Sequence, residues 1–117
     1  MVIATDDRRV FDAVTRFGGR AVMTRADHPN GTSRLAEAAE ALNLRDDTIV
    51  INVQGDEPEL EPALIDALVE TMRGTDAPVG TVASPFMPDE DPANPNIVKA
   101  VVGCDGRALY FSRALIP

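Results

Sequence analysis

Two short polar segments of this sequence carry the residue types that bind phosphate groups and a divalent metal ion. Gly31 would let a ligand approach the backbone, and the next three backbone N–H groups can face an anion at the start of a helix. Arg34 adds a fixed positive charge to that segment. Asp56 supplies a carboxylate, and Mg²⁺ is often held by one or two carboxylates together with phosphate oxygens. Together the two segments indicate phosphoryl or nucleotidyl transfer.

Each segment also has a purely structural interpretation, which the residues alone leave open. Residues 30–33 (Asn-Gly-Thr-Ser) form a common turn and helix cap, and residues 54–57 can join a strand to a helix with an acidic cap. His28 is the only histidine, and a single loop histidine is usually solvated. Cys104 is expected to lie near a hairpin tip as an inert thiol.

Apolar runs and turn signals predict the elements that must position these residues. Residues 48–53 form a nearly continuous apolar run, which is typical of a strand covered on both faces. Further strands are expected at residues 1–5, 21–23 and 79–84, and a hairpin is expected from residues 97–102 and 108–111 around Asp105 and Gly106. Strands alternate with helices through most of the chain, which predicts βαβ units and a parallel sheet with helices on both faces. Both polar segments would follow strands, at the edge of the sheet where ligands bind.

The helix ends are marked by capping residues. Residues 6–7 (Asp-Asp) can cap the first helix, and Thr32 or Ser33 can cap the second. Pro62 suits the first turn of a third helix, which Gly74 is expected to end.

Composition limits the classes of protein to consider. The chain has 117 residues, 44% of them hydrophobic, and we expect residues 1–117 to form a single domain. A net charge of −8 argues against nucleic-acid binding, and the sequence has no apolar run long enough to span a membrane. One cysteine excludes an intrachain disulfide and favours a reducing, cytoplasmic location. The chain begins directly with a strand signal and stops just after another, so we expect a piece that is incomplete at both ends.

The run NVQGDEP at residues 52–58 resembles the signature of the 3-deoxy-manno-octulosonate (Kdo) cytidylyltransferases, which make CMP-Kdo for lipopolysaccharide. Further similar segments occur in the family's order. They are VIATD at 2–6, MTRADH at 23–28, GT at 31–32, RLAE at 34–37, NPN at 94–96 with Val98 and Lys99, and ALYFSR at 108–113.

This resemblance implies a three-layer, Rossmann-like nucleotidyltransferase fold of the nucleotide-diphospho-sugar transferase type. It implies CTP and Kdo as substrates, Mg²⁺ as cofactor and CMP-Kdo and pyrophosphate as products. Asp56 would be the catalytic Mg²⁺ ligand, Gln54 would contact the sugar acid, and Arg113 would pair with the Kdo carboxylate. The family's nucleotide-binding segment corresponds to four residues of this sequence: His28, Asn30, Gly31 and Arg34.

The sequence departs from the family pattern at two positions, because Asn30 replaces a usual Ser and Ser33 replaces a usual Asp or Glu. Family members also carry an N-terminal basic loop for the triphosphate and a second metal-binding aspartate, neither of which corresponds to any part of residues 1–117. We therefore expect weak or no activity from residues 1–117 alone, and by resemblance a homodimer. Two alternatives stay open: a cytidylyltransferase for another sugar acid, such as a sialic acid, and a degenerate binding module without catalysis.

Overall fold

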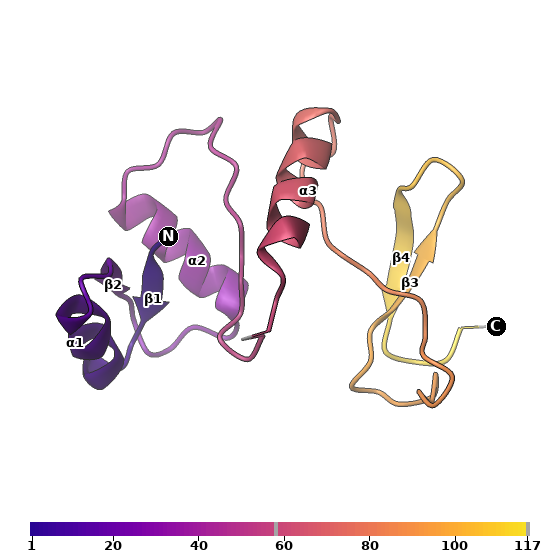
Figure 1. Ribbon diagram of the computed structural model, residues 1–117, viewed down its shortest axis with the longest axis horizontal. Helices are drawn as coiled ribbons and strands as arrows, with labels where there is room; N and C mark the ends of the chain where they lie inside the picture. The colour runs from indigo at the N-terminus through magenta and orange to yellow at the C-terminus, as the bar shows by residue number, and fades with distance from the viewer. Residues whose placement is uncertain (58, 117) are drawn as a thin grey trace. The chain divides into compact units, whose positions relative to one another are not determined.

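The computed structural model describes residues 1–57 and 59–116, which form two compact units divided between Val69 and Glu70. The single domain expected from the chain length stays a prediction. Helices and strands alternate through the first unit, and a hairpin lies in the second (Figure 1). The elements are β1 (Ile3–Thr5), α1 (Arg8–Arg16), β2 (Ala21–Met23), α2 (Gly31–Ala41), α3 (Pro62–Arg73), β3 (Lys99–Val102) and β4 (Ala108–Ser112).

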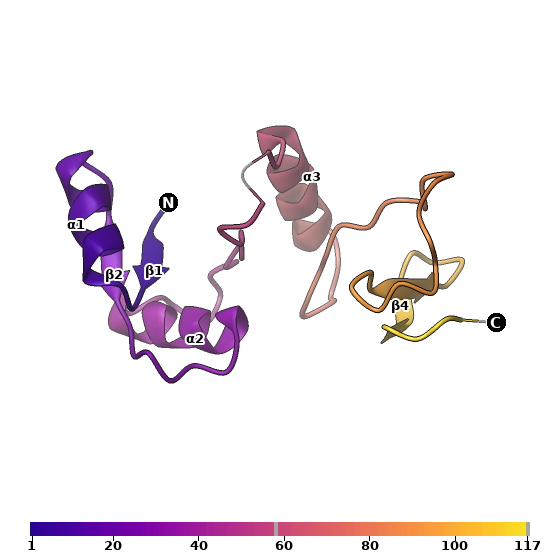
Figure 2. The ribbon, with the colours of Figure 1, turned by 90° about the horizontal axis from the view of Figure 1, so that it is seen from below.

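The first unit is built on a βαβ motif, as the alternation of strands and helices predicted. Strands β1 and β2 are parallel, with Ile3 opposite Ala21 and Thr5 opposite Met23. Helices α1 and α2 both pack against this pair, and Figure 2 shows them beside the two strands. The unit therefore has the α/β architecture that the sequence predicted, with β1 and β2 ending at the same edge.

Helix α1 begins where the sequence signals indicated. Oδ1 of Asp7 accepts a hydrogen bond from the backbone N–H of Arg9 at 2.7 Å, which makes Asp7 the N-cap. The hydroxyl of Thr5 in turn accepts the N–H of Asp7 at 3.1 Å, so the end of β1 is tied to the start of the helix. Phe17 is the C-cap, and Gly18 follows with a φ of 76°.

Helix α2 has a different cap from the one expected. Asn30, and not Thr32 or Ser33, is the N-cap: its backbone is extended and its Oδ1 accepts the N–H of Ser33 at 2.9 Å. The Ser33 hydroxyl donates back to the Asn30 carbonyl at 2.9 Å. The helix begins at Gly31, so Thr32 and Ser33 already lie inside its first turn and cannot act as caps.

Two of the expected strands do not form. Residues 48–53 and 79–84 have no strand partner within the described ranges, although both runs are rich in β-branched residues. Ile51 is 38% exposed and Val79 is 80% exposed. A strand of this kind needs neighbours for its backbone groups and cover for its faces, and these two runs find neither.

The second unit contains the expected hairpin. Strands β3 and β4 pair antiparallel, with Lys99 opposite Ser112 and an irregularity in register between Val101 and Val102. Gly106 has a φ of 81° in the connecting turn, a backbone conformation that favours glycine.

Helix α3 begins at Pro62, and the N–H of the following Gly74 bonds back into its last turn, as predicted.

Burial is sparse among the described residues. Ala38 is the only apolar residue there that is buried, and Thr5, Thr24 and Lys99 are the buried polar ones. No helix in the described ranges has both the length and the apolar composition needed to cross a bilayer.

Candidate functional site

The two chemistry-bearing segments of the sequence meet at the start of α2. A Cβ atom on Gly31 would lie 2.8 Å from Oε1 and 2.9 Å from Nε2 of Gln54. Both atoms belong to the far end of the exposed Gln54 side chain, so a Cβ at position 31 would displace this amide from its place against the helix start. Nε2 of Gln54 donates to Oδ1 of Asn52 at 2.7 Å, which orients the amide. The NVQGD segment thus meets the glycine-containing helix start through the Gln54 side chain, and a shared phosphate and metal site there stays a prediction.

Asp56 lies on a tight turn beside this contact. The N–H of Glu57 donates to the carbonyl of Gln54 at 3.2 Å, which closes the turn and leaves the Asp56 side chain exposed. The described residues contain no group of three or more His, Cys, Asp or Glu side chains that could hold a metal by themselves. One accessible carboxylate fits Mg²⁺ bound jointly by protein and phosphate oxygens, and does not fit an all-protein metal cage.

The α2 start offers fewer free amides than the sequence implied. The N–H of Ser33 bonds to the Asn30 side chain, and the N–H of Arg34 bonds to the Asn30 carbonyl at 3.4 Å. Among the hydrogen bonds between described residues, none uses the amide of Gly31 or Thr32. The expected row of three amides is therefore wrong: Gly31 and Thr32 supply the two that can face a phosphate.

Arg34 has a structural role in addition to its charge. Its Nη1 donates to the Thr24 hydroxyl at 2.7 Å and to the Arg25 carbonyl at 3.3 Å, and it lies 3.2 Å from Oδ1 of Asp6. These contacts join α2 to the segments that follow β1 and β2. The Asp6 carboxylate offsets part of the guanidinium charge, so Arg34 is not the free cation that its sequence position indicated.

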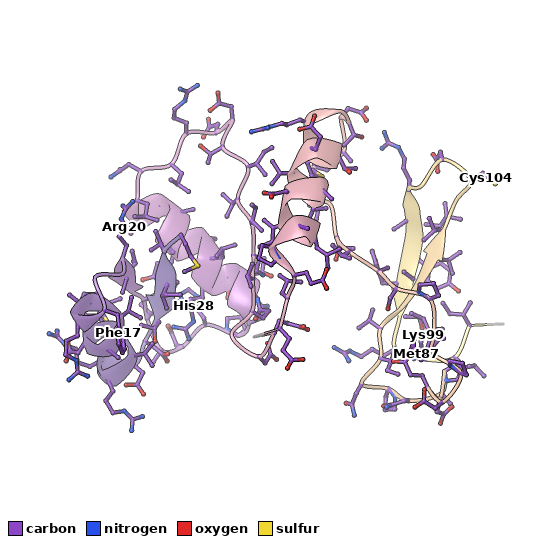
Figure 3. The ribbon with its side chains drawn as sticks, in the orientation of Figure 1. Phe17, Arg20, His28, Met87, Lys99 and Cys104 are labelled. Atoms are coloured by element: carbon purple, nitrogen blue, oxygen red, sulfur yellow. The ribbon has the colours of Figure 1, made fainter. Side chains whose placement is uncertain are left out.

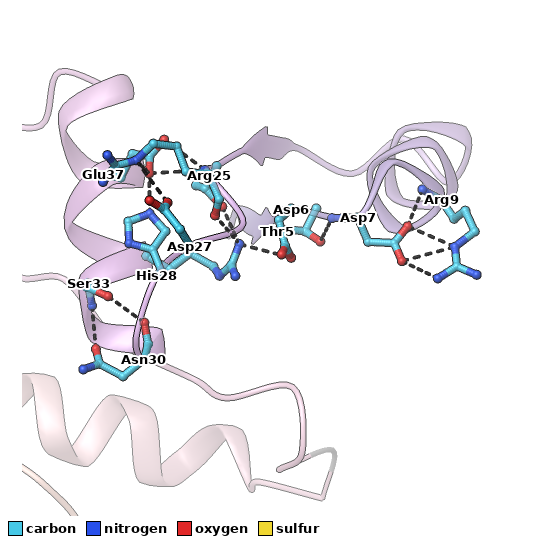
Figure 4. A network of polar contacts seen from close by, with 12 residues as sticks. Thr5, Asp6, Asp7, Arg9, Arg25, Asp27, His28, Asn30, Ser33 and Glu37 are labelled. Carbon is cyan, nitrogen blue, oxygen red and sulfur yellow. Dashed lines mark hydrogen bonds and ion pairs between the residues drawn. The ribbon is translucent and has the colours of Figure 1, made fainter.

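His28 is buried against α2 and is not solvated. Its side chain is 4% exposed, and Nε2 contacts the carboxylate of Glu37. Glu37 also accepts the backbone N–H of Arg25 at 3.2 Å and its Nε at 3.3 Å (Figure 4). A carboxylate can only accept, so Nε2 of His28 carries the proton in this contact.

Glu37 is the residue of this site that sequence reasoning missed. Hydrogen bonds from His28 first, and from Arg25 next, hold the pKa of Glu37 below its ordinary value, although partial burial works in the opposite direction. Its position in the RLAE segment, three residues after Arg34, was the available signal, because residues three or four apart share a helix face.

An open groove runs along the same face of α2. It has a volume of about 570 Å³ and its lining is rich in carboxylates: Arg25, Asp27, His28, Pro29, Ser33, Ala36, Glu37 and Glu40. Three carboxylates line the groove together with one arginine and with His28, whose Nε2 already contacts Glu37. This balance disfavours a triphosphate in the groove and leaves the Gly31 side of the helix start as the better phosphate site.

Arg113 belongs to the second unit, directly after β4. Its Nη1 donates to the Pro95 carbonyl at 2.9 Å, and its own carbonyl accepts a hydrogen bond from Nζ of Lys99 at 2.5 Å. Figure 3 labels Lys99 at the end of the hairpin opposite Cys104. Cys104 is a free, exposed thiol. Because Arg113 and Asp56 lie in different units, their convergence on one ligand stays a prediction.

The sequence is similar to known cytidylyltransferases along its whole length. A family model described as "Cytidylyltransferase" matches residues 1–117. A 3-deoxy-manno-octulosonate cytidylyltransferase of Vibrio vulnificus strain YJ016 is 48% identical over 117 residues, covering 100% of this chain and 47% of the relative. A protein of the same name from Chromohalobacter salexigens is 52% identical over 118 residues, covering 100% of this chain and 46% of the relative.

A solved structure has a similar fold. It is described as CMP:2-keto-3-deoxy-manno-octonic acid synthetase complexed with CTP, and it shares 41% sequence identity with a TM-score of 0.80. The match covers 99% of this chain and 47% of that chain. The chain spans about half the length of the curated relatives it matches.

Proposed function

Because this chain belongs to the cytidylyltransferase family, we propose that it serves in the transfer of CMP from CTP to Kdo. In this reaction the anomeric hydroxyl oxygen of Kdo bonds to the α-phosphorus of CTP. The bond from that phosphorus to the bridging oxygen breaks, pyrophosphate leaves and the hydroxyl loses its proton. The product, CMP-Kdo, would enter lipopolysaccharide synthesis.

The start of α2 would bind the nucleotide. The amides of Gly31 and Thr32 would donate to phosphate oxygens, aided by the positive end of the α2 dipole. Asn30 fixes the first turn of the helix through its cap, and this contact supports a structural part for it in the nucleotide segment. His28 and Arg34 would hold the preceding loop in place through Glu37 and Thr24.

Asp56 would be the protein ligand for Mg²⁺, shared with the phosphates of CTP. Bound Mg²⁺ would offset phosphate charge and lower the pKa of the attacking hydroxyl. Gln54 would orient the acceptor, because its Nε2 is engaged by Asn52 while Oε1 can accept from a sugar hydroxyl. Arg113 would pair with the Kdo carboxylate, for which a guanidinium is suited.

Partners and location follow from the same proposal. CTP and Kdo would be the small-molecule substrates, and the net charge of −8 argues against a nucleic-acid partner. The single free thiol of Cys104 is compatible with a reducing, cytoplasmic location. A second copy of the chain would be the protein partner, giving a homodimer.

The contact between Gly31 and Gln54 is the observation that supports this proposal best, because it brings together the segments that would bind phosphate and metal. The test is a calorimetric titration of residues 1–117 with CTP in Mg²⁺, followed by pyrophosphate release with Kdo or with a sialic acid. We expect weak CTP binding that requires Mg²⁺, and a slow release with Kdo only. No CTP binding, or release with the sialic acid instead of Kdo, would overturn the proposal. Release at the rate of a complete family member would contradict the expected weakness of residues 1–117 alone.

A further inference from the structure

Lys99 is the only lysine of a chain whose other ten cationic side chains, apart from His28, are arginines. It is also buried, with 5% of its surface exposed. A buried ammonium is costly unless its three donors find acceptors. A single lysine in such a place therefore calls for an explanation, and the function proposed above gives it no part.

All three donors of Lys99 have partners. Nζ donates to the carbonyls of Asn94 at 3.1 Å, Ile97 at 2.8 Å and Arg113 at 2.5 Å. The first two belong to the loop that precedes β3, and the third belongs to the residue directly after β4. An ammonium presents three donors around one nitrogen, whereas a planar guanidinium cannot turn its N–H groups toward three carbonyls around a point. This geometry accounts for lysine at a position where the rest of the chain would use arginine.

The same loop also holds the side chain of Arg113. Nη1 of Arg113 donates to the carbonyl of Pro95, which lies between two of the acceptors of Lys99. The main chain of Arg113 is thus fixed by Lys99, and its guanidinium is fixed by the loop that Lys99 holds. The hydrogen bonds between described residues use one of the five donors of that guanidinium and leave the rest for a ligand.

We infer that Lys99 is a positioning residue for sugar-acid recognition: it joins the 94–97 loop to the end of β4 and so presents the Arg113 guanidinium to a carboxylate. This inference rests on the proposed function for its ligand, and on the contacts of Lys99 for its mechanism. Lys99 itself does not touch the substrate. Fixing a recognition group before binding lowers the entropy that binding must otherwise cost.

The first experiment needs no variant and no substrate. Because Lys99 is the only lysine among residues 1–117, reductive methylation of a ¹⁵N-labelled protein of these residues can modify one side-chain amine and the exposed amine of Met1. We expect the Met1 amine to react and Lys99 to stay protected, with a single ammonium signal visible at neutral pH. Methylation of both amines at similar rates would overturn the inference.

The second experiment follows the Nε–H signal of Arg113 during a titration with Kdo. Lys99→Met should make Arg113 more mobile and should weaken Kdo binding by about tenfold or more, with CTP binding unchanged. Arg107→Met is the matched control, because it removes a cation from the other end of the same hairpin, where Arg107 contacts Asp76. Lys99→Arg keeps the charge and should still lose the order of Arg113, and it replaces Lys99→Met if that variant does not fold.

The outcomes separate this inference from the proposed function. If the wild-type protein does not bind Kdo while Lys99 is protected and orders Arg113, the substrate assignment fails and the positioning role stands. If the wild-type protein binds Kdo and Lys99→Met binds it equally well with an unchanged Arg113 signal, the positioning role is wrong.

Discussion

The start of α2 and the Lys99 cluster (Lys99 with the carbonyls of Asn94, Ile97 and Arg113) both use polar side chains to join loops that are distant in sequence. They differ in the kind of partner that each charged group has. Around α2, charged groups are paired with charged groups, as in the contacts of Glu37 with His28 and of Arg34 with Asp6. Around Lys99, one ammonium is paired with three neutral carbonyls.

The two regions also differ in what they leave unused. The described contacts leave the amides of Gly31 and Thr32 and the Asp56 carboxylate open to a ligand, whereas every donor of Lys99 is engaged within the chain. This difference supports our proposals that the first region binds a ligand directly and that the second acts by holding another residue. It also predicts that acid, or a substitution in one region, will change that region and leave the other unchanged.

The largest effect is expected from Gly31→Ala. The new Cβ would lie 2.8 Å from the Gln54 amide, so the Gln54 side chain would have to leave its place against the start of α2. We expect CTP affinity to fall by roughly 100-fold, because displacement of binding groups by about 1 Å can cost that much. Calorimetry measures this affinity for CTP. Gly74→Ala is the control, because its new Cβ would lie no closer than 3.6 Å to another atom, the carbonyl oxygen of Thr71. Equal CTP binding by both variants would separate Gly31 from the nucleotide site.

Asp56→Asn should have the next largest effect, and only when Mg²⁺ is present. The amide keeps the shape of the side chain and loses the charge that a hard cation requires. We expect the affinity for CTP in Mg²⁺ to fall about tenfold, which corresponds to roughly 1.4 kcal/mol. Titrations with and without Mg²⁺ measure the difference. A similar loss in the absence of the metal would show that Asp56 acts by another route.

Acid should loosen the α2 region and spare the Lys99 cluster. A carboxylate with a lowered folded-state pKa stabilises the fold above its ordinary pKa of 4.5, and this contribution is lost as pH falls through the lowered value. Glu37→Gln should therefore destabilise the 25–28 loop at pH 7, and the difference from wild type should vanish in strong acid. Amide exchange at Arg25, followed across this pH range, tests the prediction. A difference that persists at low pH would mean that packing, and not charge, explains the effect.

The smallest effect is expected from Gly106→Ala, at the turn of the hairpin. An alanine at a φ of 81° is strained, which should cost about 1 kcal/mol of stability in the second unit. CTP binding should not change, because the turn lies in the unit that does not contain Gly31. Denaturant unfolding and a CTP titration of the same sample measure both quantities. Weaker CTP binding would mean that the two regions are not independent.

Local chemistry explains which parts of the fold the sequence could predict. The Asp7 cap, the start of α3 at Pro62 and the turn at Gly106 depend on residues close in sequence, and all three were predicted correctly. Residues 48–53 have an equally strong strand pattern, but a strand also needs a partner, which pattern alone does not supply. The cap of α2 was placed two or three residues too late, because Asn, Thr and Ser are all good caps and stand close together there.

The candidate site also has parts that the sequence could predict and parts that it could not. The sequence predicted that the segments carrying Gly31 and Asp56 would lie at one edge of the sheet. The two segments do meet, through Gln54, although the strand expected at residues 48–53 does not form. For Glu37 the only signal was its place one helical turn after Arg34, and its partners His28 and Arg25 could not be predicted because they reach it from a loop. Lys99 was noticed only as part of a resemblance, because its three partners are backbone carbonyls, which carry no sequence signal.

Paramagnetic broadening by Mn²⁺–CTP, with Mg²⁺–CTP as the diamagnetic reference, tests most directly whether one site binds both phosphate and metal. Mn²⁺ replaces Mg²⁺ at oxygen ligands and broadens the NMR signals of nearby amides. The account predicts that the amides of Gly31, Thr32 and residues 54–57 broaden first and together. Broadening confined to the carboxylate-rich groove along α2, or of residues 54–57 without Gly31 and Thr32, would contradict it.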